Sequence, residues 1–513
     1  MSTPATSVRA TTRGPAGLSG VLAAALTLAV GHLVAAVLDP ATSPFVALGG
    51  AVVDRTPRWL KEFAAETFGT ADKLVLFAVM ALVAAALAFG VGVLAIRRPG
   101  PADAAVIALG VLCAVAAMSR PGVGALAPVP SLFGAGAGLL ALHALVRRLP
   151  ESGDDTRAPA RRDFLRGAGV VAVLAGLSAV GGVLVSTVGR AASAAREALH
   201  LPAPAKPAAP LPQGVQSATE GVVDFVTPNV DFYRIDTALL LPDVDPEGWS
   251  LRVHGLVARE ITLTWAELLA SDLIETYVTL TCVSNPVGGD LVGNAKWLGL
   301  PIRDLLARAD PLPEADMVLS RSVDGFTAST PIEVLTDSRD AILAVGMNDE
   351  PLPTEHGFPV RMVVPGLYGY VSATKWVTDL EVTRFADAEA YWTVRGWSEK
   401  GPIKTSSRIE VPRPSSHVKA GTVAVGGTAW AQRRGITGVE VQVDDGPWQA
   451  ATLATEASVD TWRQWSYPWP DAQVGKHTLR ARASDPEGVQ DETVAPVVPD
   501  GASGWNTVYV YVD

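Results

Sequence analysis

The chain has 513 residues and a net charge of −11, with 41 Lys and Arg against 52 Asp and Glu. This length is too great for a single domain and indicates two to four. Residues 1–199 carry a net charge of +6, whereas residues 200–513 carry −17 and hold twelve of the 13 tryptophans. Such an acidic, Trp-rich half excludes nucleic acid as an expected partner, because phosphate binding needs a basic surface.

The first 199 residues contain five apolar runs. Each is about long enough to cross a hydrocarbon core of ~30 Å as a helix that rises ~1.5 Å per residue. The runs are 17–38, 74–96, 102–118, 131–146 and 167–189. With the N-terminus inside, the cytoplasmic segments carry ten arginines, from Arg9 to Arg166, whereas the opposite segments mix cations with acids. The positive-inside rule therefore predicts a multi-pass cell membrane protein with its C-terminal half on the extracytoplasmic side.

A basic segment, Ala160-Arg-Arg-Asp-Phe-Leu-Arg166, precedes the fifth run. The Arg161-Arg162 pair followed by Phe164 resembles a twin-arginine export signal. An ordinary basic flank that holds the helix on the inside explains the same residues, so both interpretations stay open. The signal would be informative, because that route carries folded proteins and suits a cofactor inserted before export.

Two histidines, His32 and His143, lie in predicted spans and raise the question of a membrane haem. In the predicted topology their depths differ by more than ~10 Å at 1.5 Å per residue, too much for two ligands of one haem. The two cysteines, Cys113 and Cys282, form neither a Cys-x-x-Cys-His motif nor an iron–sulfur set. We therefore expect no haem in the chain, and we expect a separate electron carrier: a quinone, a cytochrome or a membrane redox protein.

The second half begins with a Pro/Ala-rich stretch, 200–215, which predicts an extended, semi-rigid linker. Residues 216–405 alternate short β-type runs with brief helical patterns, which favours an α+β domain over a doubly wound sheet. Between 406 and 513, six short β runs separated by Gly, Pro and Asp turns predict an immunoglobulin-like β-sandwich of ~100 residues. The expected fold is thus multi-domain, with an N-terminal α-helical transmembrane bundle over 1–199.

Cys282 is the single cysteine of the polar half and ends the β-rich run Tyr277-Val-Thr-Leu-Thr-Cys282. A Gly-rich loop with Gly288, Gly289 and Gly293 follows it. Cys282 has no second cysteine in the polar half with which to form a disulfide. It is therefore a buried apolar filler, a nucleophile or a metal ligand. The residue by itself leaves these three roles open.

Further polar clusters occupy 227–236, 356–376 and 391–397. Backbone amides of the Gly-rich loop, together with cationic and hydroxyl side chains of the second cluster, would form a cradle for a phosphate or another anion. His356 and the tyrosines could hydrogen-bond a heterocycle, and a thiolate beside such a cradle could ligate a soft metal. Each piece taken singly is compatible with a purely structural role.

Together, from about residue 220 to the C-terminus, these segments resemble the sulfite oxidase family of molybdopterin-dependent oxidoreductases, here of a membrane-anchored bacterial type. Thr279-Leu-Thr-Cys282 with Gly293-Asn-Ala-Lys-Trp297 is similar to the family's metal-cysteine segment. The pterin-phosphate segment is similar to Met347-Asn348, the run from His356 to Gly366, and Lys375-Trp376. The C-terminal sandwich is similar to the family's dimerisation domain, which implies a possible homodimer.

The resemblance implies a molybdenum-dependent oxidoreductase, with one molybdenum held by the pterin dithiolene and by the Cys282 thiolate. It implies catalytic roles for Cys282 and for Tyr391, as the proton-donating phenol of the pocket. The pterin contacts that it implies, besides Cys282, are Asn229, Phe232, Tyr233, His356, Arg361, Ser372, Thr374 and Lys375. Such a cofactor performs oxygen-atom transfer coupled to two electrons, while the protein orients the cofactor and selects a small-molecule substrate.

The sequence departs from sulfite oxidases at two points. In that family, basic residues follow the metal cysteine and an arginine follows an aromatic pair near the start of the domain, and these cations bind sulfite. Here Asn285-Pro286-Val287 follow the cysteine, and Ile235, followed by Asp236, takes the position of that arginine. Without such cations a dianion loses charge-assisted bonds worth about 1.5–3 kcal/mol each. We therefore expect a neutral S-oxide or N-oxide as the substrate, rather than sulfite.

Two alternatives belong to other classes. The chain could keep the fold without catalysis and act as a cell-envelope binding or interaction protein, with the sandwich as its contact surface. Cys282 with a histidine such as His356 could form a thiol hydrolase, although the sequence lacks a local signature of such a family. Molybdenum content separates the first alternative from the enzyme.

Overall fold

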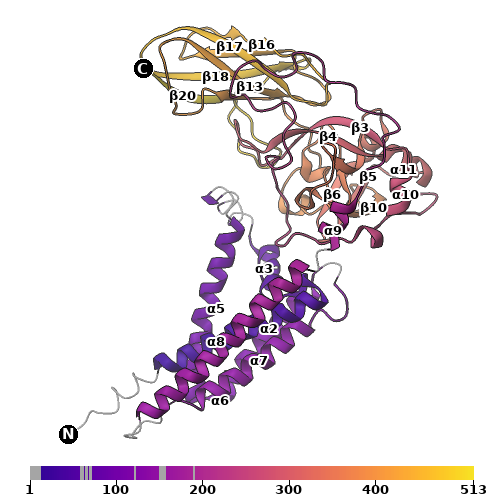
Figure 1. Ribbon diagram of the computed structural model, residues 1–513. Helices are drawn as coiled ribbons and strands as arrows, with labels where there is room; N and C mark the ends of the chain where they lie inside the picture. Colours follow the sequence, from indigo (N-terminus) through magenta and orange to yellow (C-terminus); the bar gives the residue numbers. More distant parts are fainter. Residues whose placement is uncertain are drawn as a thin grey trace. The chain divides into compact units, whose positions relative to one another are not determined.

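The computed structural model comprises two compact units (Figure 1). The first contains Met1–Arg190 with Ala238–Leu241, and the second contains Ala191–Thr237 with Pro242–Asp513. The structure describes residues 13–57, 60, 63, 67, 68, 72–120, 123–149, 157–188 and 191–513. Arg9 and the end of the fifth predicted run at 189 lie outside the described residues.

The described part of the first unit is helical. Its α-helices are α2 (Arg13–Leu38), α3 (Pro44–Arg55), α5 (Asp72–Arg97), α6 (Pro99–Met118), α7 (Val129–Val146) and α8 (Arg157–Val188). Within this unit α2 packs against α5, α7 and α8. Small residues allow this: a Cβ on Gly20 would lie 1.9 Å from the Ala88 oxygen, and one on Gly92 would lie 2.1 Å from the Ala16 oxygen. Close contact of helix backbones through glycine is typical of helices in lipid.

Five of these helices are long and apolar enough to cross a membrane, and they coincide with the five predicted runs. That they do cross one, and in which direction, stays a prediction. Helix α3, with 12 residues, was not predicted. The two histidines have separate partners: His32 Nδ1 lies 3.4 Å from Ser43 Oγ, and His143 Nε2 lies 2.8 Å from Asp103 Oδ1.

The second unit contains the predicted α+β domain, built on two sheets. The first has the order β2 (Ile261–Thr264), β1 (Ser250–Gly255), β10 (Val377–Thr383), β5 (Met317–Ser322), β6 (Thr327–Pro331). The second has the order β3 (Ile274–Thr281), β4 (Val292–Pro301), β7 (Ile342–Met347), β8 (Glu350–Pro351), with β9 (Arg361–Val363) paired to β7. Only the β1–β10 pairing is parallel among the described strands of these sheets.

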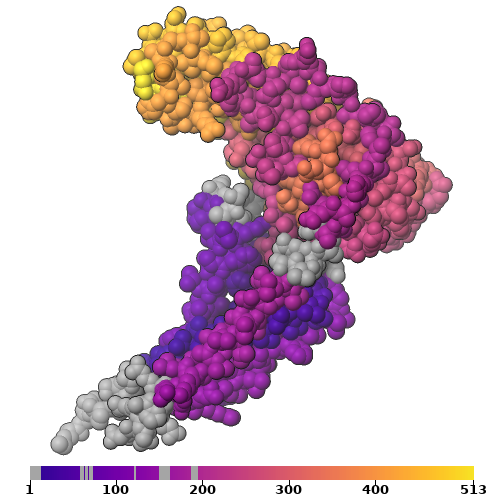
Figure 2. All heavy atoms as spheres, viewed as in Figure 1, coloured from indigo at the N-terminus to yellow at the C-terminus, as the bar shows by residue number. Residues whose placement is uncertain are grey.

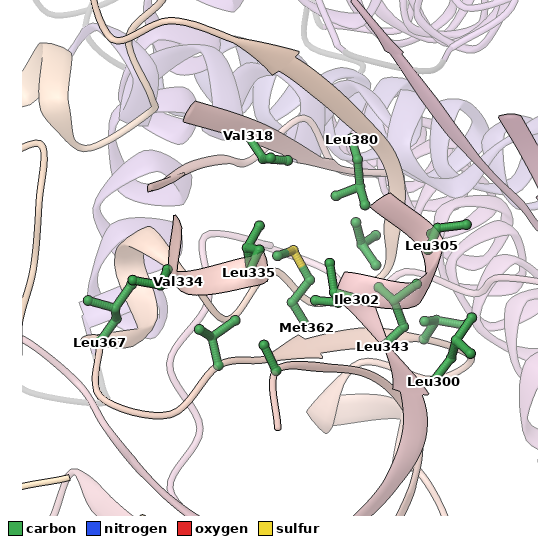
Figure 3. Close-up of a cluster of buried hydrophobic side chains, with 14 of the residues drawn as sticks. Leu300, Ile302, Leu305, Val318, Val334, Leu335, Leu343, Met362, Leu367 and Leu380 are labelled. Atoms are coloured by element: carbon green, nitrogen blue, oxygen red, sulfur yellow. The ribbon is translucent and has the colours of Figure 1, made fainter. Parts of the chain in front are cut away.

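A single apolar core joins the two sheets. Leu300, Leu343 and Met362 of the second sheet and Val318 and Leu380 of the first belong to one buried cluster (Figure 3). Helices α10 (Trp265–Leu269), α11 (Ile302–Ala309) and α12 (Ile332–Thr336) border these sheets. The amphipathic pattern of 301–309 explains α11, which contributes its apolar side to the core. Burial of apolar surface, at about 25 cal/mol per Å², holds the sheets together.

The C-terminal part is a two-layered β-sandwich. One layer has the order β11 (Ser406–Val411), β13 (Gly421–Trp430), β17 (Arg463–Ala472), β16 (Thr452–Leu453). The other has the order β12 (His417–Val418), β20 (Asn506–Val512), β18 (Gly475–Asp485), β14 (Gly438–Val443), β15 (Gln449–Ala450), with β19 (Gly488–Val489) paired to β18. Their facing residues, such as Val425 and Val441, form one core. Membership of the immunoglobulin-like class stays a prediction.

The predicted linker is extended, but it is not a free spacer. Lys206 pairs in parallel with Ile274, and the Ala205 N–H donates to the Leu273 oxygen over 2.8 Å. Prolines fit this edge position because they lack the N–H that a central strand must donate. The magenta segment that continues from it lies on the surface of the second unit (Figure 2). Within this segment the Ser217 N–H donates to Gln464 Oε1 over 2.5 Å. Composition predicted the extended backbone but not the strand edge that receives it.

The sandwich and the α+β domain bond directly to each other within the second unit. Trp462 donates its indole N–H to the Phe225 oxygen over 2.9 Å and its backbone N–H to Thr279 Oγ1 over 2.7 Å. Arg408 Nη1 donates to the Gly289 oxygen over 2.9 Å. These bonds attach the strand and loop that carry Cys282 to the sandwich.

Candidate active site

Cys282 lies just past the end of β3, at the start of a tight loop that we call the Cys loop (282–291). Its N–H donates to the Leu291 oxygen over 2.9 Å, and its own oxygen accepts from Asn285 N–H over 3.1 Å. The side chain is 8% exposed. Burial raises the pKa of the Cys282 thiol, although hydrogen bonds from Ser284 and the charge of Lys375 oppose this. The free thiol is therefore protonated near neutral pH, and a bound metal would have to stabilise the thiolate.

An aromatic wall stands beside the Cys loop. Phe232 is buried and packs edge-on against Trp297 and His356, with ring centroids 5.7 and 5.5 Å away. It lies on Gly293, where a Cβ would come within 2.8 Å of the Phe232 ring. Tyr233 stacks on Phe232 at 5.3 Å, and burial together with the charge of Cys282 raises the pKa of Tyr233. Gly293, which has no side chain, therefore leaves the space that the Phe232 ring occupies.

Asn229 connects the wall to the following segment. Its Oδ1 accepts from Asn348 Nδ2 over 2.8 Å, and its backbone oxygen lies 3.1 Å from His356 Nε2. Asn348 in turn accepts from Lys296 N–H over 2.9 Å. Asn229, Asn348 and His356, far apart in sequence, thus form one hydrogen-bonded group.

His356, Arg361 and Lys375 are buried together, and we call them the cation cluster. Burial lowers the pKa of Arg361 to about 10 and that of Lys375 to about 8. Burial and the two neighbouring cations lower the pKa of His356 to about 3, so its imidazole is neutral. His356 Nδ1 has no partner among the described residues. Arg361 bonds the backbone oxygens of Met362 and His356, at 3.4 and 3.2 Å.

Asp236 is the carboxylate that faces this cluster. It is 6% exposed, and its Oδ2 lies 3.3 Å from Lys375 Nζ and 2.8 Å from Arg234 Nε. Lys375 also donates to the Glu355 oxygen over 2.9 Å. A buried carboxylate between two cations cancels much of the positive potential that an anionic substrate would need.

Ser372 and Thr374 are buried, but their hydroxyls have partners of their own. Ser372 Oγ donates to the backbone oxygen of Tyr368 over 2.9 Å, and Thr374 Oγ1 lies 2.7 Å from Ser320 Oγ. The hydroxyls of Ser372 and Thr374 are therefore used in hydrogen bonds within the protein. The other predicted cofactor contacts lie together near Cys282: Asn229, Phe232, Tyr233, His356, Arg361 and Lys375.

Tyr391, the predicted proton-donating phenol, lies against another set of residues. Its ring packs on Phe326 and Trp392, the Arg395 guanidinium carbon is 3.6 Å from its centroid, and its N–H donates to Thr327. Two other tyrosines, Tyr233 and Tyr368, are close enough to Cys282 for its charge to affect their pKa values. Burial raises the pKa of Tyr368 to about 12. Tyr368 lies within a segment that the sequence singled out, yet no local pattern distinguished it from Tyr370.

A pocket adjoins the Cys loop, and we call it the Cys-loop pocket. Both the α+β domain and the sandwich line it. The lining residues are Thr281, Asn285, Pro286, Val287, Gly288, Tyr368, Ser406, Ser407, Trp430, Gln490 and Ala502. None of these described residues carries a formal charge.

These residues fit the molybdenum cofactor that the sequence implies. The cation cluster could bind an anion, and His356 Nδ1, which has no partner among the described residues, could contact a heterocycle. Cys282 supplies one sulfur, and no group of three or more His, Cys, Asp and Glu gathers among the described residues. One thiolate is enough if the metal arrives with its own dithiolene ligands. When bound, this cofactor supplies two-electron oxygen-atom transfer.

Known proteins resemble this chain over the same region. The model of the oxidoreductase molybdopterin binding domain matches residues 238–392. Human mitochondrial sulfite oxidase is 29% identical over 341 residues, or 56% of this chain and 62% of that protein. The uncharacterized oxidoreductase YuiH of Bacillus subtilis (strain 168) is 31% identical over 157 residues, which cover 31% of this chain and 76% of YuiH. The chain thus spans less than two thirds of the human protein.

Among solved structures, the sulfane dehydrogenase SoxCD from Paracoccus pantotrophus has a TM-score of 0.49 and 24% identity, over 57% of this chain and 82% of that chain. The fold and the site define a molybdopterin-binding oxidoreductase domain. The chain belongs to the sulfite oxidase family of molybdenum-dependent oxidoreductases. The predicted family, enzyme class and cofactor are confirmed.

Proposed function

We propose that this protein is a membrane-anchored enzyme that transfers an oxygen atom to or from a small uncharged substrate, an S-oxide or N-oxide rather than sulfite. In the reducing direction the reaction takes two electrons and two protons, cleaves the S–O or N–O bond, and releases the sulfide or amine with water. Cys282 is the protein ligand of the metal, and the cation cluster holds the anionic end of the cofactor.

One observation carries the choice of substrate: the Cys-loop pocket is lined by uncharged residues. Asn285, Pro286 and Val287, which follow Cys282 closely in the chain, are among these lining residues. The nearby Arg234 and Lys375 are already paired with the buried Asp236. Sulfite would therefore enter this pocket without charge-assisted bonds, each worth about 1.5–3 kcal/mol, whereas a neutral oxide needs only hydrogen-bond donors.

The protein's residues divide the remaining work. Arg361 and Lys375 neutralise the cofactor's phosphate, while His356, Asn229, Phe232 and Tyr233 orient the pterin. His356 contributes as a neutral donor or acceptor, because burial lowers its pKa to about 3. Desolvation of these groups strengthens each electrostatic contact with the cofactor.

Five helices of the first unit are long and apolar enough to span a membrane. They would anchor the enzyme with its catalytic half on the extracytoplasmic side. Electrons would come from a separate quinone, cytochrome or membrane redox protein, and the sandwich would provide a homodimer contact. A phosphatase reporter fused after residue 215 should be active if the sidedness is right, and a cytoplasmic reporter at that point should not.

The decisive experiment is metal analysis of the full chain made in a host that produces the cofactor. We expect about one molybdenum per chain and loss of nearly all of it in Cys282→Ser, because the ligand is removed. Cys113→Ser, a cysteine outside the second unit, should keep the metal. Metal-free wild-type protein would instead indicate a non-catalytic envelope protein. A dye-linked assay with dimethyl sulfoxide, trimethylamine N-oxide and sulfite then tests the substrate, and activity on sulfite alone would contradict the choice of an oxide.

A further inference from the structure

The Cys-loop pocket contains hydrogen-bond donors that the protein itself does not use. Tyr368 is 4% exposed, and its hydroxyl accepts from the Lys404 N–H over 3.3 Å. Its O–H donates to no other described residue. A buried phenol normally finds an acceptor for this proton, so an undonated O–H at a pocket wall points to a ligand.

The position of Tyr368 is fixed by its surroundings. Its backbone N–H donates to the Gly401 oxygen over 2.7 Å, and the ring passes so close to Gly501 that a Cβ there would lie 2.7 Å from the hydroxyl. A phenol held this firmly is a preorganised donor, because no side-chain rotation has to be frozen when a ligand binds.

Asn285 supplies a second donor from the Cys loop itself. It is 8% exposed, and its Oδ1 accepts from the Leu291 N–H over 2.9 Å. This bond fixes which end of the amide is oxygen, so the NH₂ group faces away from Leu291. The Nδ2 group donates to no described residue. By contrast Ser407 Oγ, on the sandwich side of the pocket, donates to Gln490 Oε1 at 2.8 Å or to the Ala481 oxygen at 3.2 Å, and Gln490 Nε2 donates to the Gly504 oxygen over 2.8 Å.

We propose that Tyr368 and Asn285 are substrate-binding residues that hold the oxygen of a neutral S-oxide or N-oxide in the Cys-loop pocket. The proposal rests on the oxygen-atom transfer proposed above and adds the groups that recognise the substrate. Two neutral donors favour a strongly polarised but uncharged oxygen, such as that of dimethyl sulfoxide. They give a dianion no compensating charge, and they have little to offer a sulfide or amine without oxygen.

The test uses the molybdenum-loaded full chain and three variants, assayed for reduction of dimethyl sulfoxide and trimethylamine N-oxide. Tyr368→Phe removes the hydroxyl, which is both the donor and the acceptor of the Lys404 N–H, and we expect kcat/KM to fall about tenfold, mainly through KM. Asn285→Asp keeps the oxygen that accepts from Leu291 but replaces the NH₂ donor with a repelling carboxylate, so its loss should be larger, about 100-fold.

Tyr370→Phe is the matched control. It lies two residues away, is 8% exposed, and already donates its O–H to the Ser398 oxygen over 2.7 Å. It should stay within about twofold of wild type in KM. Molybdenum content and thermal midpoint of Tyr368→Phe should match those of Tyr370→Phe, because neither change touches the metal ligand.

The outcomes separate the two proposals. A wild-type enzyme that reduces neither oxide overturns the proposed function, and this inference with it. A wild type that reduces an oxide while Tyr368→Phe and Asn285→Asp keep its KM overturns the inference alone. Loss of molybdenum in Tyr368→Phe would also overturn it, since the residue would then support the cofactor instead of the substrate.

Discussion

The cation cluster and the Cys-loop pocket differ in charge. The cation cluster buries Arg361 and Lys375, and the pKa of Lys375 falls to about 8 because so little water reaches it. The Cys-loop pocket is lined by uncharged residues. Burying cations without full compensation destabilises a protein, so it persists where an anion is to be bound. Under the proposed function, the buried charge would serve the cofactor and the uncharged pocket would serve the substrate.

The largest expected effect is the loss of cofactor binding when a buried cation is removed. Arg361→Gln takes away a guanidinium that donates to backbone oxygens and lies over the Trp297 ring, and that has no carboxylate partner among the described residues. We expect cofactor binding to weaken by roughly 10- to 150-fold, the range for a charge-assisted bond of about 1.5–3 kcal/mol. Molybdenum retained after dialysis measures this loss. Arg303→Gln, whose guanidinium pairs with Asp340, is the control and should retain the metal. Equal retention in both variants would place the anion elsewhere.

The neutrality of His356 predicts a pH dependence of stability. The unfolded chain binds a proton on this residue near its ordinary pKa of 6.5, whereas the folded chain does so only near 3. Between these values the unfolded state holds more protons, so stability falls as pH decreases below 6.5. From pH 6.5 to 5 the contribution is roughly 2 kcal/mol, at about 1.4 kcal/mol per pH unit.

Urea unfolding of the cofactor-free full chain in detergent would measure this contribution by tryptophan fluorescence, since twelve of 13 tryptophans lie in the second half. His356→Gln removes the titrating group but leaves the carboxylates that also respond to acid. The variant should therefore lose about 2 kcal/mol less than wild type between pH 6.5 and 5. Parallel pH profiles would mean that His356 becomes protonated in the folded protein.

A smaller effect should follow from freeing the cations that Asp236 neutralises. Asp236→Asn leaves Lys375 and Arg234 without their shared carboxylate. Inhibition of oxide reduction by sulfate or sulfite should then strengthen about tenfold, because an anion can take the place of the carboxylate. Glu260→Gln breaks an exposed pair with Arg252 and should change nothing measurable. Unchanged inhibition in Asp236→Asn would show that these cations do not face the substrate.

Much of the fold was predictable from local pattern. Apolar runs of 16 to 23 residues match the five long helices, because length and hydropathy are local properties. The strand that leads to Cys282 and the amphipathic α11 followed from periodicity and composition. Helix α3 was missed because its short apolar run resembled a loop between spans. The pairing of the linker with β3 was not predicted, because the strand edge that accepts it is a feature of the folded domain.

The candidate site divides in the same way. The resemblance to the sulfite oxidase family singled out Cys282, His356, Arg361 and Lys375, and the structure gathers them near one another. Ser372 and Thr374 did not join them as free hydroxyls, because Tyr368 and Ser320 supply partners that sequence cannot reveal. The choice between Tyr391 and Tyr368 depends on ring placement, and the segments that hold each ring are far apart in sequence.

The sequence by itself determined the division into an apolar and a polar half, the α+β and β-rich order of the second half, the single sulfur, and the absence of basic residues after it. These follow from composition, period and local motif. Only the tertiary structure decided that Asp236 meets Lys375, 139 positions away, and that the Tyr368 O–H is left without an acceptor. Charge pairing and hydrogen-bond satisfaction depend on which side chains packing brings together, and no local signal encodes that.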